Sequence, residues 1–185
     1  MKALSKTFAL TLATLHLGLT MVCMQGCDLA MNPLIFDGTP VEATFPVISP
    51  VTLFPPLVYS VDLEDILSES DNAVDSIKAY NITMLIDNPG AANLALTCNM
   101  TVNGDTLLTM NNTPASALAS ERTIFDSKLT ALGLSYSPTI VPTINGYLKQ
   151  NPKPRVTVLV SGVGTPAPLN FTIHVKLYSQ VFTGS

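Results

Sequence analysis

The stretch RVTVLVSGVGTPAPLNFTIHVKLYSQVF, residues 155–182, decides the expected fold. Apolar residues alternate with other residues on both sides of the central GTPAP, and they are Val156, Val158, Val160, Leu169, Phe171, Ile173, Val175 and Leu177. A period of two is typical of antiparallel strands with one buried face and one solvated face. We therefore expect a β-hairpin. Its solvated face would carry Asn170, Thr172, His174 and Lys176.

Two earlier segments, 76–88 and 96–104, show the same alternation. Their expected inner positions are Tyr80, Ile82, Met84 and Ile86 in the first, and Leu96, Cys98, Met100 and Val102 in the second. Turn residues follow both segments, as Asn88-Pro89-Gly90 and Asn103-Gly104-Asp105. Cys98 is therefore predicted to be a buried packing residue, not a reactive thiol.

Two helical insertions are expected between the strands. The first spans 60–74, with Ser60 or Asp62 as N-cap and an acidic outer face. That face lacks the loop spacing and central glycine of a calcium site, so we expect no metal there. The second spans 114–133, whereas 135–154 is broken by prolines and is predicted to be a loop with at most one helical turn.

A sheet with one apolar face must cover that face with another layer. The sequence therefore predicts a mainly β fold, an antiparallel immunoglobulin-like β-sandwich with two short helical insertions. Residues 76–104, SIKAYNITMLIDNPGAANLALTCNMTVNG, resemble the strand, Asn-Pro turn, strand, Asn-Gly layout of type 2 late-embryogenesis-abundant domains. That resemblance implies a seven-stranded sandwich without known catalytic machinery.

The N-terminus has the arrangement of a secretory leader, with basic MKALSK followed by an uncharged, mostly apolar run over 7–24. The next residues, Met24-Gln25-Gly26-Cys27, resemble the bacterial lipobox, although Met24 and Gln25 depart from its commonest form. The resemblance implies cleavage between Gly26 and Cys27 and acylation of Cys27, which would become the new N-terminus. Two alternatives are an uncleaved membrane-spanning helix and a retained segment in which Cys27 is a buried thiol.

Six prolines between residues 32 and 56 suggest an extended segment, because proline cannot donate to a strand ladder. We therefore expect three parts: a lipoprotein signal peptide over 1–26, a Pro-rich tether or edge segment over 27–56, and the β-sandwich domain over 57–185.

The composition excludes several classes of function. The chain has 9 Lys and Arg against 13 Asp and Glu, so a broad basic surface for nucleic acid is not expected. No Gly-X-Ser-X-Gly, phosphate loop, Cys-X-X-Cys or His-Glu-X-X-His motif is present. Because His174 is the one histidine outside the leader, we expect no catalytic residues, no metal site and no cofactor.

The sequence thus predicts a membrane-anchored, non-enzymatic lipoprotein of the bacterial cell envelope that acts as a structural or interaction module. Its partners would be the membrane, through the N-terminal lipid, and an envelope protein that meets strand edges or loops at one end of the sandwich. The alternative is a carrier for an apolar ligand held between the sheets. A hydrolase is a third interpretation, and it would depend on His174.

Overall fold

The computed structural model describes residues 34–38, 40–62, 74–150 and 154–183. Apart from Leu34, these residues belong to one compact unit, residues 35–184. Its strands are β1 (Leu34–Asp37), β2 (Val41–Ser49), β3 (Leu53–Asp62), β4 (Val74–Asp87), β5 (Ala95–Val102), β6 (Asp105–Pro114), β7 (Arg122–Thr123), β8 (Leu134–Tyr136), β9 (Arg155–Thr165) and β10 (Leu169–Thr183). Its helices are the 3-10 helix η1 (Ala115–Leu118), α3 (Ser127–Ala131) and α4 (Ile140–Leu148).

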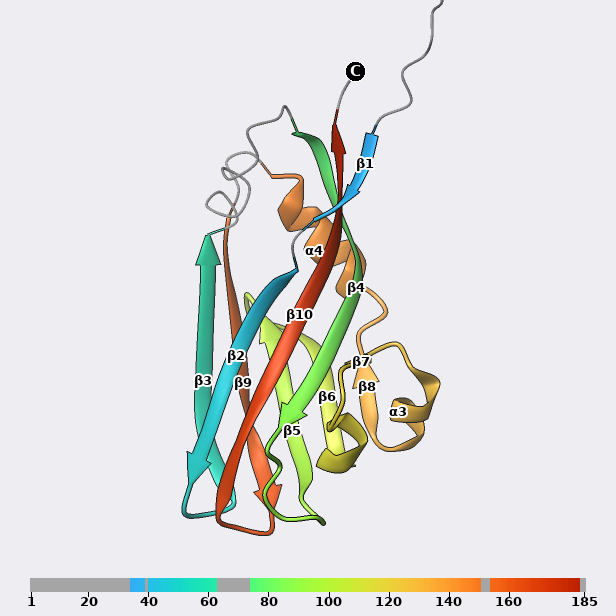
Figure 1. Ribbon diagram of the computed structural model, residues 1–185. Helices are drawn as coiled ribbons and strands as arrows, with labels where there is room; N and C mark the ends of the chain where they lie inside the picture. The colour runs from blue at the N-terminus through green and yellow to red at the C-terminus, as the bar shows by residue number, and fades with distance from the viewer. Residues whose placement is uncertain (1–33, 39, 63–73, 151–153, 184–185) are drawn as a thin grey trace, which may run out of the picture. The chain divides into compact units, whose positions relative to one another are not determined.

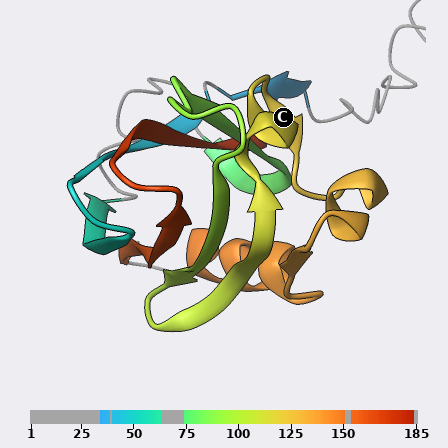
Figure 2. The same cartoon turned by 90° about the horizontal axis from the view of Figure 1, so that it is seen from below.

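These strands form two sheets that face each other as a β-sandwich (Figures 1 and 2). Sheet A has the order β1-β10-β4-β7, and β2 also pairs with β10. Sheet B has the order β3-β9-β5-β6-β8, and the long strands pair antiparallel in both sheets. The predicted mainly β, antiparallel sandwich is confirmed. The sheet order does not establish the immunoglobulin-like arrangement.

The predicted hairpin over 155–182 is wrong, because its two strands belong to different sheets. β9 pairs with β3 and β5, whereas β10 pairs with β2 and β4. The connection between them therefore crosses from sheet B to sheet A. The predicted faces are nevertheless correct, since Val160, Phe171 and Ile173 are all buried between the sheets. Two strands on opposite sides of a core show the same alternation as two strands side by side.

The connection between β5 and β6 is a hairpin, as its turn residues predict. Val102 pairs with Asp105 across the two-residue turn Asn103-Gly104. Both turn residues have positive φ, 50° for Asn103 and 93° for Gly104, as a type I′ turn requires. By contrast, Asn88-Pro89-Gly90 leads from β4 in sheet A to β5 in sheet B.

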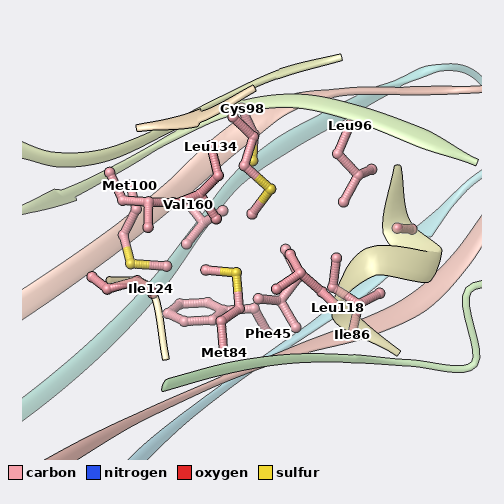
Figure 3. Close-up of a cluster of buried hydrophobic side chains, with 14 of the residues drawn as sticks. Phe45, Met84, Ile86, Leu96, Cys98, Met100, Leu118, Ile124, Leu134 and Val160 are labelled. Carbon is pink, nitrogen blue, oxygen red and sulfur yellow. The ribbon is translucent and has the colours of Figure 1, made fainter. Parts of the chain in front are cut away.

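The core is formed by side chains from both sheets, and Figure 3 shows its central part. Met84 and Phe45 of sheet A lie opposite Cys98, Met100 and Val160 of sheet B. Aromatic pairs join the two layers: Phe54 with Phe171 at a centroid distance of 6.2 Å, and Phe45 with Tyr59 at 6.4 Å. Both pairs have the edge-to-face geometry that aromatic rings prefer.

Residues 41–56 of the predicted Pro-rich tether or edge segment form edge strands of the sandwich, not a free tether. β2 and the start of β3 occupy this segment, and they bury Phe45, Val47 and Phe54. The prolines are tolerated because both strands lie at sheet edges, where a missing N–H faces away from the ladder. The sandwich therefore begins before residue 57. Residues 27–33 of the predicted tether lie outside the described residues.

A bulge in β4 changes the predicted burial of one residue. Ile82, Met84 and Ile86 are buried as expected, but the Tyr80 side chain is 45% exposed. The register between β4 and β10 shifts here, since Tyr178 pairs with Asn81 and Ser179 with Ala79. The extra residue reverses the alternation, so that Ala79 and Ile77 are buried instead.

The predicted helix over 114–133 is wrong, because η1, β7 and α3 replace it. The β-branched pair Thr123 and Ile124 favours extended structure, and Thr123 pairs with Thr83 of β4. Asp126 then begins α3, because its Oδ1 accepts a hydrogen bond from the backbone N–H of Lys128 at 2.9 Å. Gly133 follows α3 with a φ of 94°.

The other two helix predictions also change. Ser60 and Asp62 lie in β3 and Val74 begins β4, so neither proposed N-cap starts a helix. The rest of that predicted helix, 63–73, lies outside the described residues. The segment predicted as a loop over 135–154 contains the nine-residue helix α4. Pro142 sits in the first turn of α4, where a missing N–H costs no helical hydrogen bond.

Gly162 provides a test of how closely β9 and β5 approach. A Cβ at this position would overlap the Cβ of Cys98, its partner in β5, and the carbonyl oxygen of Thr97. We expect Gly162→Ala to lower the free energy of unfolding by about 1–3 kcal/mol through overpacking. Urea unfolding followed by circular dichroism measures the change.

Gly146 of α4 is the matched control, since a Cβ there would meet no atom within 4 Å. Gly146→Ala is expected to raise the free energy of unfolding by up to about 1 kcal/mol, because alanine favours the helix. Equal effects of the two substitutions would contradict the packing described for β9.

Candidate functional site

The predicted lipidation site, Gly26 and Cys27, lies outside the described residues. Cys98 is buried in β5, and burial raises the pKa of its thiol to about 12. Because the thiolate is the reactive form of cysteine, Cys98 is a packing residue, as predicted. His174 lies on the outer face of sheet A, where its Nδ1 is 2.8 Å from Oε1 of Glu42.

The outer face of sheet A carries a network of polar side chains centred on Glu121, which precedes β7. Oε1 of Glu121 accepts hydrogen bonds from the Tyr178 hydroxyl at 2.6 Å and the Thr83 hydroxyl at 2.7 Å. Oε2 accepts one from Lys176 Nζ at 3.0 Å. Lys176 also lies 3.8 Å from Glu42, which links this group to the His174 pair. We call these residues the Glu121 network.

The hydrogen bonds change the titration of the network. Donors from Tyr178, Thr83 and Lys176 favour the charged carboxylate and lower the pKa of Glu121 to about 2. The same carboxylate raises the pKa of Lys176 and of Tyr178, in each case first through the hydrogen bond that it accepts. The charges of Glu121 and Lys176 are thus paired with each other.

The network has a structural role that the sequence did not reveal. Glu121 lies just before β7, a strand of two residues that pairs only with Thr83 and Met84. Its bonds to β4 and β10, together with a 2.7 Å bond from the Thr123 hydroxyl to Asn81 Oδ1, hold β7 on the sheet. Because the alternation is weak here, the sequence placed Glu121 in a helix.

An apolar cavity of about 90 Å³ lies between the sheets at the end covered by α4. It is lined by both sheets and by Ile140, Ile144, Tyr147 and Leu148, which form the inner face of α4. All lining side chains are apolar except for the hydroxyls of Tyr147 and Tyr59. The sequence did not predict this helix, and so it did not predict that residues of α4 line the cavity.

Asn145 attaches α4 to the bulged part of β4. Its Oδ1 accepts a hydrogen bond from the Ala79 N–H at 2.7 Å, and its Nδ2 donates to the Ala79 carbonyl at 3.3 Å. The side-chain amide thus takes the place of a neighbouring strand at Ala79, which is completely buried. These two hydrogen bonds join α4 to the edge of sheet A.

Large apolar side chains are exposed along β3 and at the connection from β2 to β3. Leu53 is 61% exposed and Val58 is 59% exposed. Val163 of β9 pairs with Leu53 and is also exposed. Ile48 and Val51 are exposed at the β2–β3 connection. We call Leu53, Val58 and Val163, which belong to sheet B, the apolar edge patch.

A shallow groove of about 610 Å³ lies beside this patch on the outer face of sheet B. Leu53, Pro55 and Pro56 line it on the β3 side, and Gly162 contributes no side chain to it. Its polar lining is uncharged and consists of Thr97, Asn99, Thr109, Asn111 and Ser161. Such a surface offers hydroxyls and amides as hydrogen-bond partners, without any charge.

The described residues contain neither a cluster of metal ligands nor a membrane-spanning helix. In residues 34–38, 40–62, 74–150 and 154–183, no group of three or more His, Cys, Asp or Glu side chains is placed to hold a metal ion. In the same residues, no helix is long and apolar enough to cross a membrane.

Comparison with known proteins does not identify a family. No protein-family model matches the sequence, and no curated protein matches it significantly. A solved structure named Desmodium yellow mottle tymovirus aligns over 82% of this chain and 88% of its own chain, at 11% identity and a TM-score of 0.37. A score this low supports neither a shared topology nor a shared function.

The low pKa of Glu121 predicts acid sensitivity. Since the unfolded chain binds this proton near pH 4.5 and the folded chain only near pH 2, stability falls as the pH drops between these values. We expect the loss to be about 1 kcal/mol, because Glu121 is partly exposed and solvent screens its charge. Urea unfolding at pH 6, 4.5, 3 and 2 measures it. If Glu121→Gln lost stability with falling pH as the wild-type protein does, Glu121 would not be the cause of the acid sensitivity.

The Asn145 attachment predicts a local effect. Asn145→Ala leaves the buried Ala79 N–H and carbonyl without this partner, and we expect a loss of about 1–3 kcal/mol. Hydrogen exchange at the Ala79 amide should become at least tenfold faster. Gln150→Ala, which removes an exposed amide just after α4, is the control and should change neither value. Unchanged exchange in Asn145→Ala would show that α4 is held in another way.

Proposed function

We propose that this protein is a lipid-anchored, non-enzymatic interaction module of the bacterial cell envelope, and that it binds a protein partner along β3. The observation that carries the proposal is the exposed edge of sheet B. Within the described residues, β3 is the last strand of its sheet and pairs on one side only, with β9. A free strand edge offers backbone groups for pairing with a strand of a partner.

The apolar edge patch supports the same proposal. An exposed apolar surface costs free energy in water unless a partner covers it. Leu53 and Val58 lie on the edge strand, and Val163 lies next to it. The prolines at 55 and 56 block pairing in the first part of β3, so the partner strand would pair with Leu57–Asp62.

The lipid anchor is supported by the sequence alone. Gly26 and Cys27 match the cleavage and acylation positions of the bacterial lipobox. Acyl chains contribute about 0.8 kcal/mol for each buried CH₂, so two chains hold a protein firmly to a bilayer. The module would then act at a membrane surface of the envelope.

The anchor is tested by the intact mass and membrane partition of the full-length protein. We expect a chain that begins at Cys27 and carries acyl groups. Cys27→Ser should lose both the cleavage and the acyl groups, so that its mass is that of the unmodified chain with its leader. A wild-type chain without acyl groups would contradict the lipid anchor.

The docking surface is tested by a photoreactive amino acid at Val58 in the bacterium that encodes the protein. We expect one crosslinked partner from Val58 and none from Tyr80, another exposed residue, which lies in sheet A. Leu53→Asp should reduce the Val58 crosslink at least tenfold without changing the fold by circular dichroism. Equal crosslinking from both positions, or no effect of Leu53→Asp, would rule out this surface.

The cavity beneath α4 favours a second candidate function, the binding of an apolar ligand between the sheets. The interior is not completely filled at this end, and the unfilled space is apolar. Cavities of this kind remain dry and accept apolar molecules.

A further inference from the structure

We propose that the α4 end of the sandwich is a binding site for a single unbranched alkyl chain, such as that of a fatty acid or of a membrane lipid. This alkyl-chain site rests on the second candidate function, the binding of an apolar ligand. It adds the ligand class, the direction in which the chain enters and the residues that limit the length of the bound chain. It does not depend on the docking surface along β3.

The chemistry of the lining selects for hydrocarbon. No charged residue lines the cavity, and the tyrosine hydroxyls are the polar side-chain groups in its lining. A buried charge or an unpaired amide of a ligand would therefore lose its hydration without compensation. An alkyl chain has no such cost, and each buried CH₂ contributes about 0.8 kcal/mol.

The lining of the cavity is more deeply buried towards the centre of the core. Met84, Met100 and Ile124 are buried there (Figure 3). Val61, near the end of β3, and Leu177 of β10 are only partly buried among the described residues. A chain would therefore enter with its methyl group first and leave its polar head at the surface.

The partly buried part of the lining comes from strand ends. The start of β2, the end of β3 and the start of β9 contribute Val41, Val61 and Val156, and these strand ends lie at the end of the sandwich that also carries β1 and α4 (Figure 1). β1 is the described strand closest in sequence to Cys27. The connection between β2 and β3, with its exposed Ile48 and Val51, lies at the opposite end (Figure 1).

The size of the cavity limits the length of alkyl chain that it can hold. A longer chain would fit only if lining side chains moved. A volume of about 90 Å³ is smaller than the engineered cavity of about 150 Å³ that accepts benzene. A longer segment requires the deeply buried part of the lining to yield. Met84 and Met100 are suited to this because methionine has an unbranched, flexible side chain. Ala43, a small residue of β2 in the lining, keeps the space open.

The test uses the full-length chain in phosphatidylethanolamine and phosphatidylglycerol vesicles. One sample contains a fatty acid with a mid-chain diazirine, and the other contains a phosphatidylcholine with the same photoreactive acyl tail. After irradiation, peptide mass spectrometry locates the label. We expect it on lining residues, with Met84 or Met100 among them. Labelling by the first probe alone identifies a free fatty acid as the ligand source, and labelling by the second identifies a bilayer lipid.

Two variants at matched positions make the result specific. Ala43→Leu adds three carbon atoms inside the cavity and should reduce labelling of the lining at least fivefold. Ala131→Leu makes the same change on the exposed face of α3 and should leave labelling unchanged. Val158→Phe, in the cavity wall on β9, is a second filling variant if Ala43→Leu does not fold.

Label confined to residues outside the lining, or equal labelling in the filled and control variants, would overturn the proposal. The Val58 crosslink is measured separately, in the bacterium. An unlabelled cavity in the wild-type protein together with a Val58 crosslink would reject the alkyl site alone, and a labelled cavity without a Val58 crosslink would reject the docking surface alone.

Discussion

The two sheets of this protein each have one apolar face, and neither face is stable unless the other sheet covers it. This mutual burial explains why the chain crosses between the sheets at the β2–β3, β4–β5 and β9–β10 connections. Contacts such as Phe54 with Phe171 join strands that share no backbone hydrogen bond. The core therefore holds together segments from the whole described length, including the proline-containing strands β2 and β3. Removing either strand would expose the opposite sheet.

Each sheet of an open sandwich has edge strands with unpaired backbone groups. In this protein some of these edges are covered by other groups and some are not. At Ala79 the Asn145 side chain pairs with the β4 backbone, and further along β4 the short strand β7 is held by Glu121. Both devices cover the edge of sheet A with polar groups that have partners. β2 and the start of β3 carry prolines instead. The rest of β3, from Leu57 to Asp62, has neither device among the described residues, which is why we assign the partner to this strand.

The two proposed functions use neighbouring parts of one domain. The partner strand would pair with Leu57–Asp62, and Tyr59 and Val61 of this segment also line the cavity. The Glu121 network lies on the outer face of sheet A and serves the stability of that sheet. Neither proposal requires a catalytic residue among the described residues.

The sequence by itself determined which residues face the core in most strands. The alternation correctly placed Ile82, Met84, Leu96, Cys98 and Phe171 inside, and Asn103-Gly104 correctly marked a hairpin, because both signals depend on neighbours in the chain. Only the tertiary structure decided that β9 and β10 belong to different sheets, that a bulge turns Tyr80 outward, and that 114–133 breaks into three elements. A period of two records that a face is buried but not which strand lies beside it. That choice, like the position of α4 and its cavity, depends on packing between residues far apart in sequence.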